Sequence, residues 1–406
     1  MAVDRLEPGR NRPEHPRREG TGVGDEQSRR SPIAGPRGSR IAIVYGTRPE
    51  AVKLRGIAAL LGRAAVLIHT GQHYDPEMAA AFEAGIGFPA PEHRLAIGGG
   101  TRGRQIADAT VGLETLFAAE RRDSHAPFDA VIVQGDTNTA LSGALAANVE
   151  RIPLVHVEAG LRSRDRAMPE EHNRVVVDHL ADLCAAPTGV SAANLANEGI
   201  CGDDRVKVTG NTVVEAVLAL RPDASATNGI LAKHGVERDR FVLATFHRPE
   251  NVDDPEMLAT ILSELAALPI PVLLPLHPRT AVRAAEAGLE PLLDKLLVAP
   301  PVGYREFLGL MGSAALLVSD SGGVQEESSV VKRPVVVVRQ STERPEVLGT
   351  FSRLVAPGPG VADAAREWLD DLAAVHERLA ALPSPYGDGH ASELTVAATE
   401  RLVASR

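Results

Sequence analysis

The stretch AALLVSDSGGVQEES, residues 314–328, shows how this chain folds. A short apolar run ends in a polar turn with two adjacent glycines, Gly322 and Gly323, and a helical pattern follows. A strand buried in a parallel sheet and turning directly into a helix has this pattern. The new helix would present free N–H groups and its positive dipole end to a phosphate or diphosphate. An ordinary strand-to-helix connection explains the same residues equally well.

The same pattern of an apolar run, a polar turn and a helix recurs along the chain on both sides of this stretch. Runs rich in Val, Ile and Leu, each followed by a polar turn and a helical pattern, occupy residues 41–45, 65–69, 129–134, 152–157, 206–210, 241–246, 271–276, 295–300, 314–319 and 333–338. This pattern predicts an α/β fold with two parallel sheets. We expect an N-terminal domain over 41–208 and a C-terminal domain over 209–386. The last stretch, 387–406, is expected to form a helix that packs back on the N-terminal domain.

The first forty residues differ in composition from the rest of the chain. They contain nine Arg, five Pro and six acidic residues, with few apolar ones. Such a segment cannot bury enough apolar area to offset the entropy lost on ordering, so residues 1–40 are predicted to be disordered. They lack the apolar stretch of a secretory signal. The simpler interpretation is that this segment is an extension without a function of its own. The alternative is an Arg-rich arm that binds a partner.

Overall composition narrows the function classes. The chain has 406 residues and a net charge of −10, and aromatic residues make up 3%. An acidic, aromatic-poor chain is unsuited to a nucleic-acid-binding face. No apolar run reaches the ~20 residues of a membrane span. Two cysteines cannot build a disulfide framework, which favours a reducing compartment. We therefore expect a cytoplasmic enzyme that binds neither nucleic acid nor membrane.

Charged residues follow several predicted strands of the N-terminal domain. Arg48 and Lys53 come after the first strand, and two cations there would suit an anionic ligand. Asp136 and Glu158 each lie just past a strand, and carboxylates that share one site shift each other's pKa values, as acid–base chemistry requires. Glu170 and Arg174 are spaced i, i+4 on a helix, where a simple stabilising ion pair is the alternative. These residues are candidates for proton transfer and ligand binding.

The predicted C-terminal domain has a similar set of polar and charged residues after its strands. His247 follows its first strand, and a histidine there can transfer protons or bind phosphate. Glu327, about one turn into the helix after the glycines, could accept bonds from ribose hydroxyls, and Arg344 could neutralise a diphosphate. His277, Gln72 and His73 have similar but weaker placements. The sequence has no metal-ligand spacing of known type, so no metal site is predicted.

Taken together, these strings resemble the UDP-N-acetylglucosamine 2-epimerase family. The matching segments, in family order, are GTRPEAVKL, TGQHYD, GDTNTA, HVEAGLRS, MPEEHNR, VTGNTV, HRPENV, SDSGGVQEE and STERPE, which span about residues 41–357. The resemblance implies two Rossmann-like domains in the glycosyltransferase-B arrangement, with an active-site cleft between them. It also implies a homodimer that uses neither a metal nor another cofactor.

The resemblance also implies roles for individual residues. Asp136, Glu158, Glu170 and His247 would be catalytic. Ser321, Gly322 and Gly323 would hold the diphosphate with Arg344, Glu327 would hold the ribose, and Phe307 would pack on the uracil. Phe307 is equally well explained as a core aromatic of a helix. The remaining cations, Arg48, Lys53 and Arg174, would line the sugar and phosphate side. An allosteric substrate site would include Gln72, His73 and His277.

The implied reaction is reversible epimerisation at C2 of UDP-N-acetylglucosamine to UDP-N-acetylmannosamine. It would proceed through elimination of UDP and a bound 2-acetamidoglucal, with the product entering polysaccharide biosynthesis. Two other enzymes share these residues: a hydrolysing epimerase that releases N-acetylmannosamine and UDP, and a 2-epimerase of a modified sugar such as a UDP-2,3-diacetamido uronate. A retaining glycosyltransferase and a non-catalytic sugar-nucleotide sensor are the remaining alternatives. The sequence leaves open which carboxylate acts on which face of C2.

Overall fold

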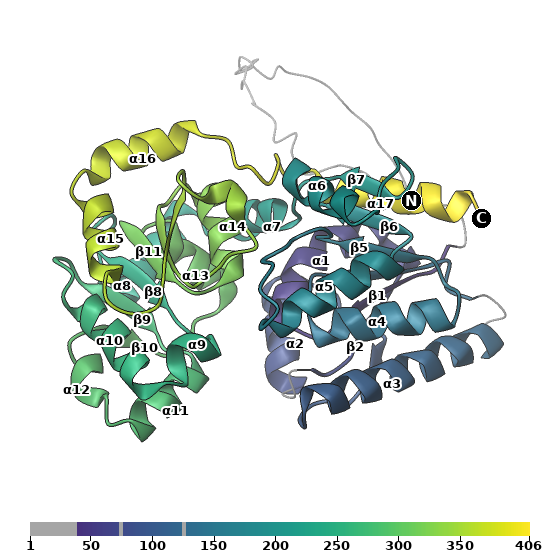
Figure 1. The fold of residues 1–406 in the computed structure, drawn as a ribbon, viewed down its shortest axis with the longest axis horizontal. Coiled ribbons are helices and arrows are strands. Elements are labelled where there is room, and N and C mark those ends of the chain that lie inside the picture. Colours follow the sequence, from purple (N-terminus) through teal and green to yellow (C-terminus); the bar gives the residue numbers. More distant parts are fainter. Residues whose placement is uncertain (1–38, 73–75, 124–126) are drawn as a thin grey trace, which may run out of the picture. The chain divides into compact units, whose positions relative to one another are not determined.

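The computed structural model describes residues 39–72, 76–123 and 127–406. The segment predicted to be disordered therefore lies, except for Ser39 and Arg40, outside the described residues. Within these ranges the chain forms two all-parallel sheets surrounded by helices (Figure 1). The strand order is β3-β2-β1-β4-β5-β6-β7 in the first sheet and β10-β9-β8-β11-β12-β13 in the second. The α/β class with two parallel sheets is thus confirmed.

The strands are short, as expected for parallel strands with helices on both faces. The first sheet contains β1 (Ile41–Tyr45), β2 (Ala65–His69), β3 (His93–Arg94), β4 (Ala130–Gln134), β5 (Leu154–Val157), β6 (Leu183–Ala186) and β7 (Val206–Val208). The second sheet contains β8 (Val242–Thr245), β9 (Val272–Pro275), β10 (Leu297–Ala299), β11 (Leu316–Ser319), β12 (Val335–Val338) and β13 (Ser352–Val355).

Helices alternate with the strands along the chain. Those that accompany the first sheet are α1 (Arg48–Leu61), α2 (Pro76–Gly85), α3 (Arg102–Asp123), α4 (Asn138–Val149), α5 (Pro169–Leu180) and α6 (Gly189–Asn197), with a 3₁₀ turn at Gly62–Ala64. The remainder are α7 (Val213–Leu220), α8 (Ala224–His234), α9 (Pro249–Val252), α10 (Pro255–Ala266), α11 (Pro278–Glu286), α12 (Glu290–Leu293), α13 (Tyr304–Met311), α14 (Gly322–Val331), α15 (Val361–Leu369), α16 (Leu372–Ala381) and α17 (Ala391–Ala404), with a 3₁₀ turn at Pro345–Val347.

Strand β1 illustrates why the predicted runs are apolar without alternation. All five of its residues are buried. Ile41 and Ile43 belong to the cluster that contains the apolar face of α1, whereas Ala42 and Val44 belong to the cluster that contains α4. Successive side chains point to opposite faces, so a strand covered on both faces needs apolar residues at every position.

All ten predicted runs coincide with strands, and three further strands were not predicted. β1 and β2 have the predicted bounds, and the other runs are trimmed by one to three residues at their ends. The unpredicted strands are β3, β6 and β13. Two of them, β3 and β13, lie at sheet edges, where one side lacks a neighbour and apolar content is lower. β6 has the sequence LCAA, too short and too poor in β-branched residues to stand out.

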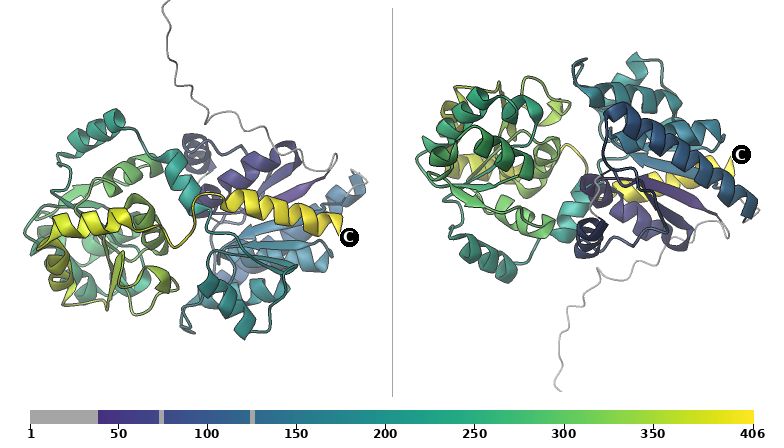
Figure 2. Two further views of the ribbon diagram at one scale, coloured as in Figure 1. Left: turned by 90° about the horizontal axis from the view of Figure 1, so that it is seen from above. Right: turned by 90° about the horizontal axis from the view of Figure 1, so that it is seen from below.

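The C-terminal helix α17 packs beside the first sheet. It contacts α1 and β6, and Figure 2 shows this yellow helix, which ends at the C-terminus, running alongside the purple and teal elements of the first sheet. Helix α7 contacts both α1 and α14. The domain bounds at residues 208 and 209 stay a prediction. In the described ranges, no helix is both long and apolar enough to cross a membrane.

Candidate active site

The sheet topology brings the predicted residues to two switch points. The strand order of the first sheet reverses between β1 and β4, and that of the second sheet reverses between β8 and β11. Ligands of open α/β sheets bind beyond the carboxyl ends of strands at such points. Arg48 and Asp136 follow β1 and β4, and His247 and Ser321 follow β8 and β11. The motifs singled out in the sequence therefore occupy the positions where this class of fold binds its ligands.

Four buried charged side chains form a ring in which cations and carboxylates alternate. Lys53 and Glu158 come from segments of the first sheet, and Glu326 and Arg344 come from segments of the second. Lys53 Nζ lies 2.6 Å from Glu158 Oε2 and 2.8 Å from Glu326 Oε2. Arg344 donates from Nε to Glu326 Oε1 at 2.7 Å and from Nη2 to Glu158 Oε1 at 3.2 Å. All four side chains are at most 8% exposed. Buried charges are tolerated only when paired in this way, so removal of one member leaves its neighbours unbalanced.

Glu158 has the environment of an acid–base group. Its backbone adopts φ +71°, a left-handed conformation that non-glycine residues rarely take outside functional turns. Burial, and then the neighbouring Glu326 carboxylate, raises the pKa of Glu158 to about 7, against the opposing effect of Lys53 and Arg344. Gln134 on β4 donates a hydrogen bond to the same carboxylate. At neutral pH the group can therefore both accept and release a proton.

A second cluster of charges contains Asp136 and Arg174. Arg174 Nη2 lies 2.6 Å from Asp136 Oδ2 and 3.9 Å from Glu343 Oε1. Arg174 also pairs with Glu171, its i−3 neighbour on α5, and not with Glu170, whose side chain is exposed. The i, i+4 pairing considered for Glu170 is therefore wrong, because α5 turns Glu171 rather than Glu170 toward the Arg174 guanidinium.

Glu343 connects this cluster to the ring. It is 3% exposed and pairs with Arg344 on one side, while Arg339 Nη1 lies 2.9 Å from its Oε2. Burial alone would raise the pKa of Glu343, but the surrounding guanidinium groups, foremost Arg344 and Arg339, hold it well below its usual range. A continuous path of ion pairs therefore runs from Asp136 through Arg174, Glu343 and Arg344 to Glu158.

His247 is held by an aspartate at the second switch point. Its ring Nδ1 lies 3.1 Å from Asp320 Oδ1, and its backbone N–H donates to Asp320 Oδ2 at 3.0 Å. Asn251 also donates to Asp320 Oδ2. Burial would raise the pKa of Asp320, but the bonds from His247 and its neighbours lower it. The ionised Asp320 fixes the ring orientation, and the His247 side chain stays 41% exposed and accessible to a ligand.

Of the two glycines in the opening stretch, Gly322 lies beside Arg344, one of the two cations of the ring. Ser321 is the N-cap of α14 and makes no side-chain capping bond. A Cβ on Gly322 would lie 2.6 Å from Arg344 Nη1 and 3.0 Å from Glu343 Oε1, so only glycine allows this approach. Gly323 has more space, since its nearest neighbour is Ser321 Oγ at 3.9 Å. The N-terminus of α14 and the Arg344 guanidinium thus converge, which suits an anionic group.

The predicted ribose residue lies on α14 and the predicted uracil residue on α13. Glu327 is 7% exposed, and its Oε1 accepts a hydrogen bond from the Tyr304 hydroxyl at 2.7 Å. Burial raises the pKa of Glu327 to about 7. Phe307 is half-buried against the main apolar cluster. The ribose role of Glu327 and the uracil role of Phe307 stay predictions. Tyr304 is an additional polar group beside Glu327.

The remaining predicted residues are placed less tightly. Arg48 is exposed, with its guanidinium 5.4 Å from the centre of the Phe82 ring. Gln72 accepts hydrogen bonds from the backbone and the hydroxyl of Thr139. The rings of His277 and His247 lie 5.6 Å apart. His73 lies outside the described residues. The structure therefore places the ring of His277 against that of His247, a predicted catalytic residue, and places Gln72 against Thr139.

Sequence reasoning missed several polar residues of this site. Each adjoins a residue that was named: Asp320 precedes Ser321, Glu326 precedes Glu327, and Glu343 precedes Arg344. The signal that could have found Glu326 is helical geometry. Neighbouring residues on a helix point about 100° apart. Two adjacent glutamates near a ligand therefore face different parts of the site. Arg339 and Asn251 gave no such signal.

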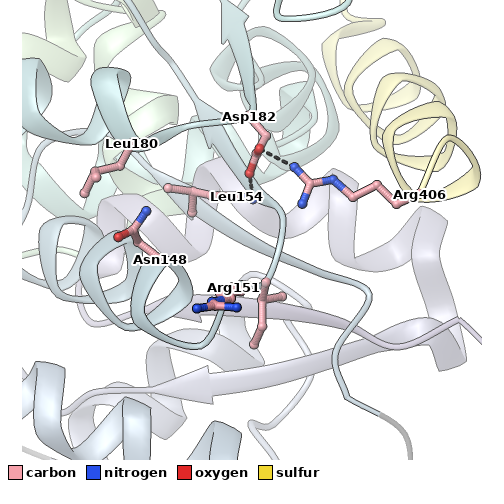
Figure 3. A pocket seen from close by; sticks show the side chains of 7 residues that line it. Asn148, Arg151, Leu154, Leu180, Asp182 and Arg406 are labelled. Carbon is pink, nitrogen blue, oxygen red and sulfur yellow. Dashed lines mark hydrogen bonds and ion pairs between the residues drawn. The ribbon is translucent and has the colours of Figure 1, made fainter.

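A separate pocket lies at the opposite, amino edge of the first sheet. It has a volume of about 220 Å³ and is lined by Asn148, Arg151, Ile152, Leu154, Leu180, Asp182 and Arg406. Figure 3 shows Asp182 paired with Arg406 beside Leu154, the first residue of β5. None of the predicted site residues lines it. Among the residues that the structure describes, no cluster of three or more His, Cys, Asp or Glu is arranged to hold a metal ion.

Two parallel Rossmann-like sheets whose switch points carry carboxylates, guanidinium groups and an open helix N-terminus define a class of α/β proteins that act on anionic ligands. The family model described as UDP-N-acetylglucosamine 2-epimerase matches residues 62–400. The chain belongs to this family, and the predictions of the family and of an enzyme are confirmed.

Individual relatives agree with this assignment. UDP-N-acetylglucosamine 2-epimerase of Methanocaldococcus jannaschii is 37% identical over 369 residues, which cover 88% of this chain and 98% of the relative. UDP-2,3-diacetamido-2,3-dideoxy-D-glucuronate 2-epimerase of Pseudomonas aeruginosa is 36% identical, with 76% and 86% covered. The crystal structure of the M. jannaschii enzyme in complex with UDP-GlcNAc and UDP has a TM-score of 0.75, with 88% and 98% covered. The predicted glycosyltransferase-B architecture is confirmed by such structures.

Proposed function

We propose that the protein reversibly epimerises UDP-N-acetylglucosamine at C2 to UDP-N-acetylmannosamine. The observation that carries this proposal is the buried ring of Lys53, Glu158, Glu326 and Arg344 beside the open N-terminus of α14. It combines a carboxyl group that titrates near neutrality with cations suited to a diphosphate. The relative from M. jannaschii, whose structure holds UDP-GlcNAc and UDP, supports the same substrate.

The nucleotide binds to the C-terminal domain in this proposal. Ser321, Gly322 and Gly323 present the N-terminus of α14 to the diphosphate, and Arg344 adds a guanidinium beside it. Glu327 accepts hydrogen bonds from the ribose, and Phe307 packs on the uracil. Arg48, Lys53 and Arg174 supply further cations on the sugar side. These charges stabilise UDP as a leaving group, because they neutralise the charge that develops on it.

The chemistry is an elimination followed by an addition. The C1–O bond to UDP breaks while a base removes the C2 proton, and a C1–C2 double bond forms in the bound 2-acetamidoglucal. The C2 proton is not acidic, because no carbonyl is attached to C2, so C1–O cleavage runs ahead with oxocarbenium character. A proton then adds to C2 from the opposite face, and the UDP oxygen bonds again to C1. Asp136, Glu158, Glu170 and His247 are the proposed catalytic groups.

The relative from Pseudomonas aeruginosa favours a second candidate, 2-epimerisation of a UDP-2,3-diacetamido uronate. This reaction has the same bond changes at C1 and C2 and differs in the substituents at C3 and C5. Epimerisation with release of free N-acetylmannosamine is a third outcome, in which water captures the intermediate.

The compartment, oligomeric state, domain bounds and pathway of the enzyme are proposed from the sequence. We propose that it works in the cytoplasm as a homodimer, that its domains span residues 41–208 and 209–386, and that its product serves polysaccharide biosynthesis. Two cysteines in 406 residues, Cys184 and Cys201, support a reducing compartment. No cofactor is consumed by the proposed steps, because the proton and UDP that leave are both returned.

Proton NMR of UDP-N-acetylglucosamine incubated with the full chain in D2O tests the proposal. The expected result is deuterium at C2 together with signals of the manno epimer, and no free sugar. Stoichiometric UDP with free N-acetylmannosamine would instead establish the hydrolysing reaction. Turnover of the diacetamido uronate alone would establish the second candidate, and tight binding without C2 exchange would contradict an epimerase.

A further inference from the structure

A fully buried histidine–aspartate pair lies behind the loops that carry Asp136 and Glu158. His156 on β5 and Asp178 on α5 are both 0% exposed. The ring Nδ1 of His156 lies 2.6 Å from Asp178 Oδ1, and its Nε2 lies 2.9 Å from the carbonyl oxygen of Gly135. Neither residue can touch a ligand, so any part they have in the reaction is indirect.

The bond to Gly135 identifies which ring nitrogen of His156 donates. A carbonyl oxygen only accepts, so Nε2 of His156 carries a hydrogen. Burial would raise the pKa of Asp178, but His156 and Arg162 hold it below its ordinary value. Arg162 lies 2.7 Å from Asp178 and pairs with Glu198, which extends the buried cluster.

This cluster ties two catalytic loops to one another. His156 donates to Gly135, the residue before Asp136, and Asp178 Oδ2 accepts from the backbone N–H of Gly160 at 3.2 Å. Gly135 and Gly160 both have positive φ angles, as does Glu158 between the two bonds. Backbone in this region persists only where its surroundings determine it strongly. The His156–Asp178 pair thus holds both turns from the buried side.

We propose that His156, paired with Asp178, is a positioning residue that sets the spacing between Asp136 and Glu158. This inference rests on the proposed function, because it concerns the two carboxylates assigned to proton transfer. A shift of about 1 Å in a catalytic group costs about 100-fold in rate. The pair therefore contributes to turnover without contacting the substrate.

Two amide variants separate the two bonds of the ring. The amide nitrogen of Asn occupies the place of Nδ1, and that of Gln occupies the place of Nε2. His156→Gln keeps a donor for the Gly135 carbonyl, and we expect kcat to fall less than about 10-fold, whereas His156→Asn loses that donor and kcat falls about 100-fold. KM stays near its original value in both. His179→Gln is the control, since this ring on α5 is exposed and bonds to the Val175 carbonyl of its own helix.

Two outcomes decide between positioning and a merely structural role. A structural role predicts equal loss of thermal stability in the two variants and unchanged kcat per folded molecule, which would overturn the proposal. Equal kcat in the Asn and Gln variants would also overturn it. Inactivity of the original protein and of His179→Gln toward UDP-N-acetylglucosamine would instead refute the proposed function.

Hydrogen–deuterium exchange gives a readout that does not need activity. In the original protein the Gly135 N–H donates to Val157 at 3.0 Å. We expect His156→Asn to speed exchange at Gly135 and Asp136 relative to His156→Gln, while exchange in α1 stays unchanged. Identical exchange at these two residues in both variants would contradict the positioning role, whatever the substrate of the enzyme is.

Discussion

At the scale of single residues, Lys53 has the most demanding surroundings. Its ammonium group lies between Glu158 and Glu326, and it is 7% exposed. Burial lowers the pKa of Lys53, but the two carboxylates outweigh this effect and raise it, so the lysine stays charged. Lys53→Met would leave two buried carboxylates facing each other, and we expect a loss of about 3–5 kcal/mol in unfolding free energy. Urea unfolding at pH 7.5 measures it.

A surface lysine supplies the comparison for this variant. Lys233 pairs with Glu306 at 2.7 Å, but its side chain is 63% exposed. Surface ion pairs contribute about 0–1 kcal/mol, so Lys233→Met should unfold almost like the original protein. Equal stability of both variants would show that the buried ring does not depend on its lysine. Activity should be lost in Lys53→Met alone.

Glu50 makes stability depend on pH. It is 1% exposed and accepts hydrogen bonds from Gly46 N, Thr47 Oγ1 and Thr137 Oγ1. Burial raises the pKa of Glu50 from 4.5 to about 7. The folded state therefore binds more protons than the unfolded state between these values, and stability falls as pH rises through this window.

Glu50→Gln removes this dependence, because an amide keeps hydrogen-bonding capacity without titrating. The variant should gain about 2–3 kcal/mol relative to the original protein between pH 5 and pH 8. Thermal unfolding at several pH values measures the difference. Glu237→Gln is the control, since that side chain is 79% exposed. Parallel pH curves for Glu50→Gln and the original protein would refute the raised pKa.

At the scale of elements, the docking of α17 on α1 depends on a glycine. A Cβ on Gly56 of α1 would clash with Ser392 Oγ and lie 3.1 Å from Ser392 Cβ. Ser392 also donates to Glu215 of α7, so it cannot move away freely. Gly56→Val should therefore destabilise the protein by about 1–3 kcal/mol through overpacking. Calorimetry measures the shift.

Gly229→Ala is the matched control for Gly56→Val. Gly229 lies within α8, and a Cβ there would meet nothing within 4 Å. Alanine in a helix interior is favoured over glycine by about 0.5–1 kcal/mol, so this variant should be slightly more stable than the original protein. Destabilisation by both variants to the same extent would show that contact with α17 is not the cause.

The elements also show how far sequence reasoning reaches. Central strands such as β1 and β11 were predictable, because burial on both faces demands an unbroken apolar run. Asp136 and Ser321, which come directly after the central strands β4 and β11, lie at the sheet edge where they were expected. Side-chain pairings were not predictable, because they depend on which helix face meets which loop. Glu171 rather than Glu170 pairs with Arg174, and Glu326 joins the ring although only its neighbour Glu327 was named from the sequence.

At the scale of the whole molecule, one apolar cluster joins the elements of both sheets. Ile43 of β1, Val217 of α7, Val324 of α14 and Leu243 of β8 all belong to it. A continuous core predicts that both sheets unfold in one cooperative step, although they lie in separate stretches of the chain. Amide exchange under conditions that report global unfolding can resolve the two sheets separately.

Leu258→Ala tests this cooperativity. Leu258 is 0% exposed on α10, in a cluster on the far face of the second sheet that contains no residue of the first. The substitution should cost about 2–5 kcal/mol, and in a single cooperative unit the slowest amides of β1 and β8 lose protection by the same amount. Leu113 lies in the cluster on the outer face of the first sheet, and Leu113→Ala should lower the protection of the slowest amides of β8 as much as that of β1. Faster exchange confined to the mutated sheet would mean that each sheet unfolds alone, because the shared cluster would then not transmit the loss.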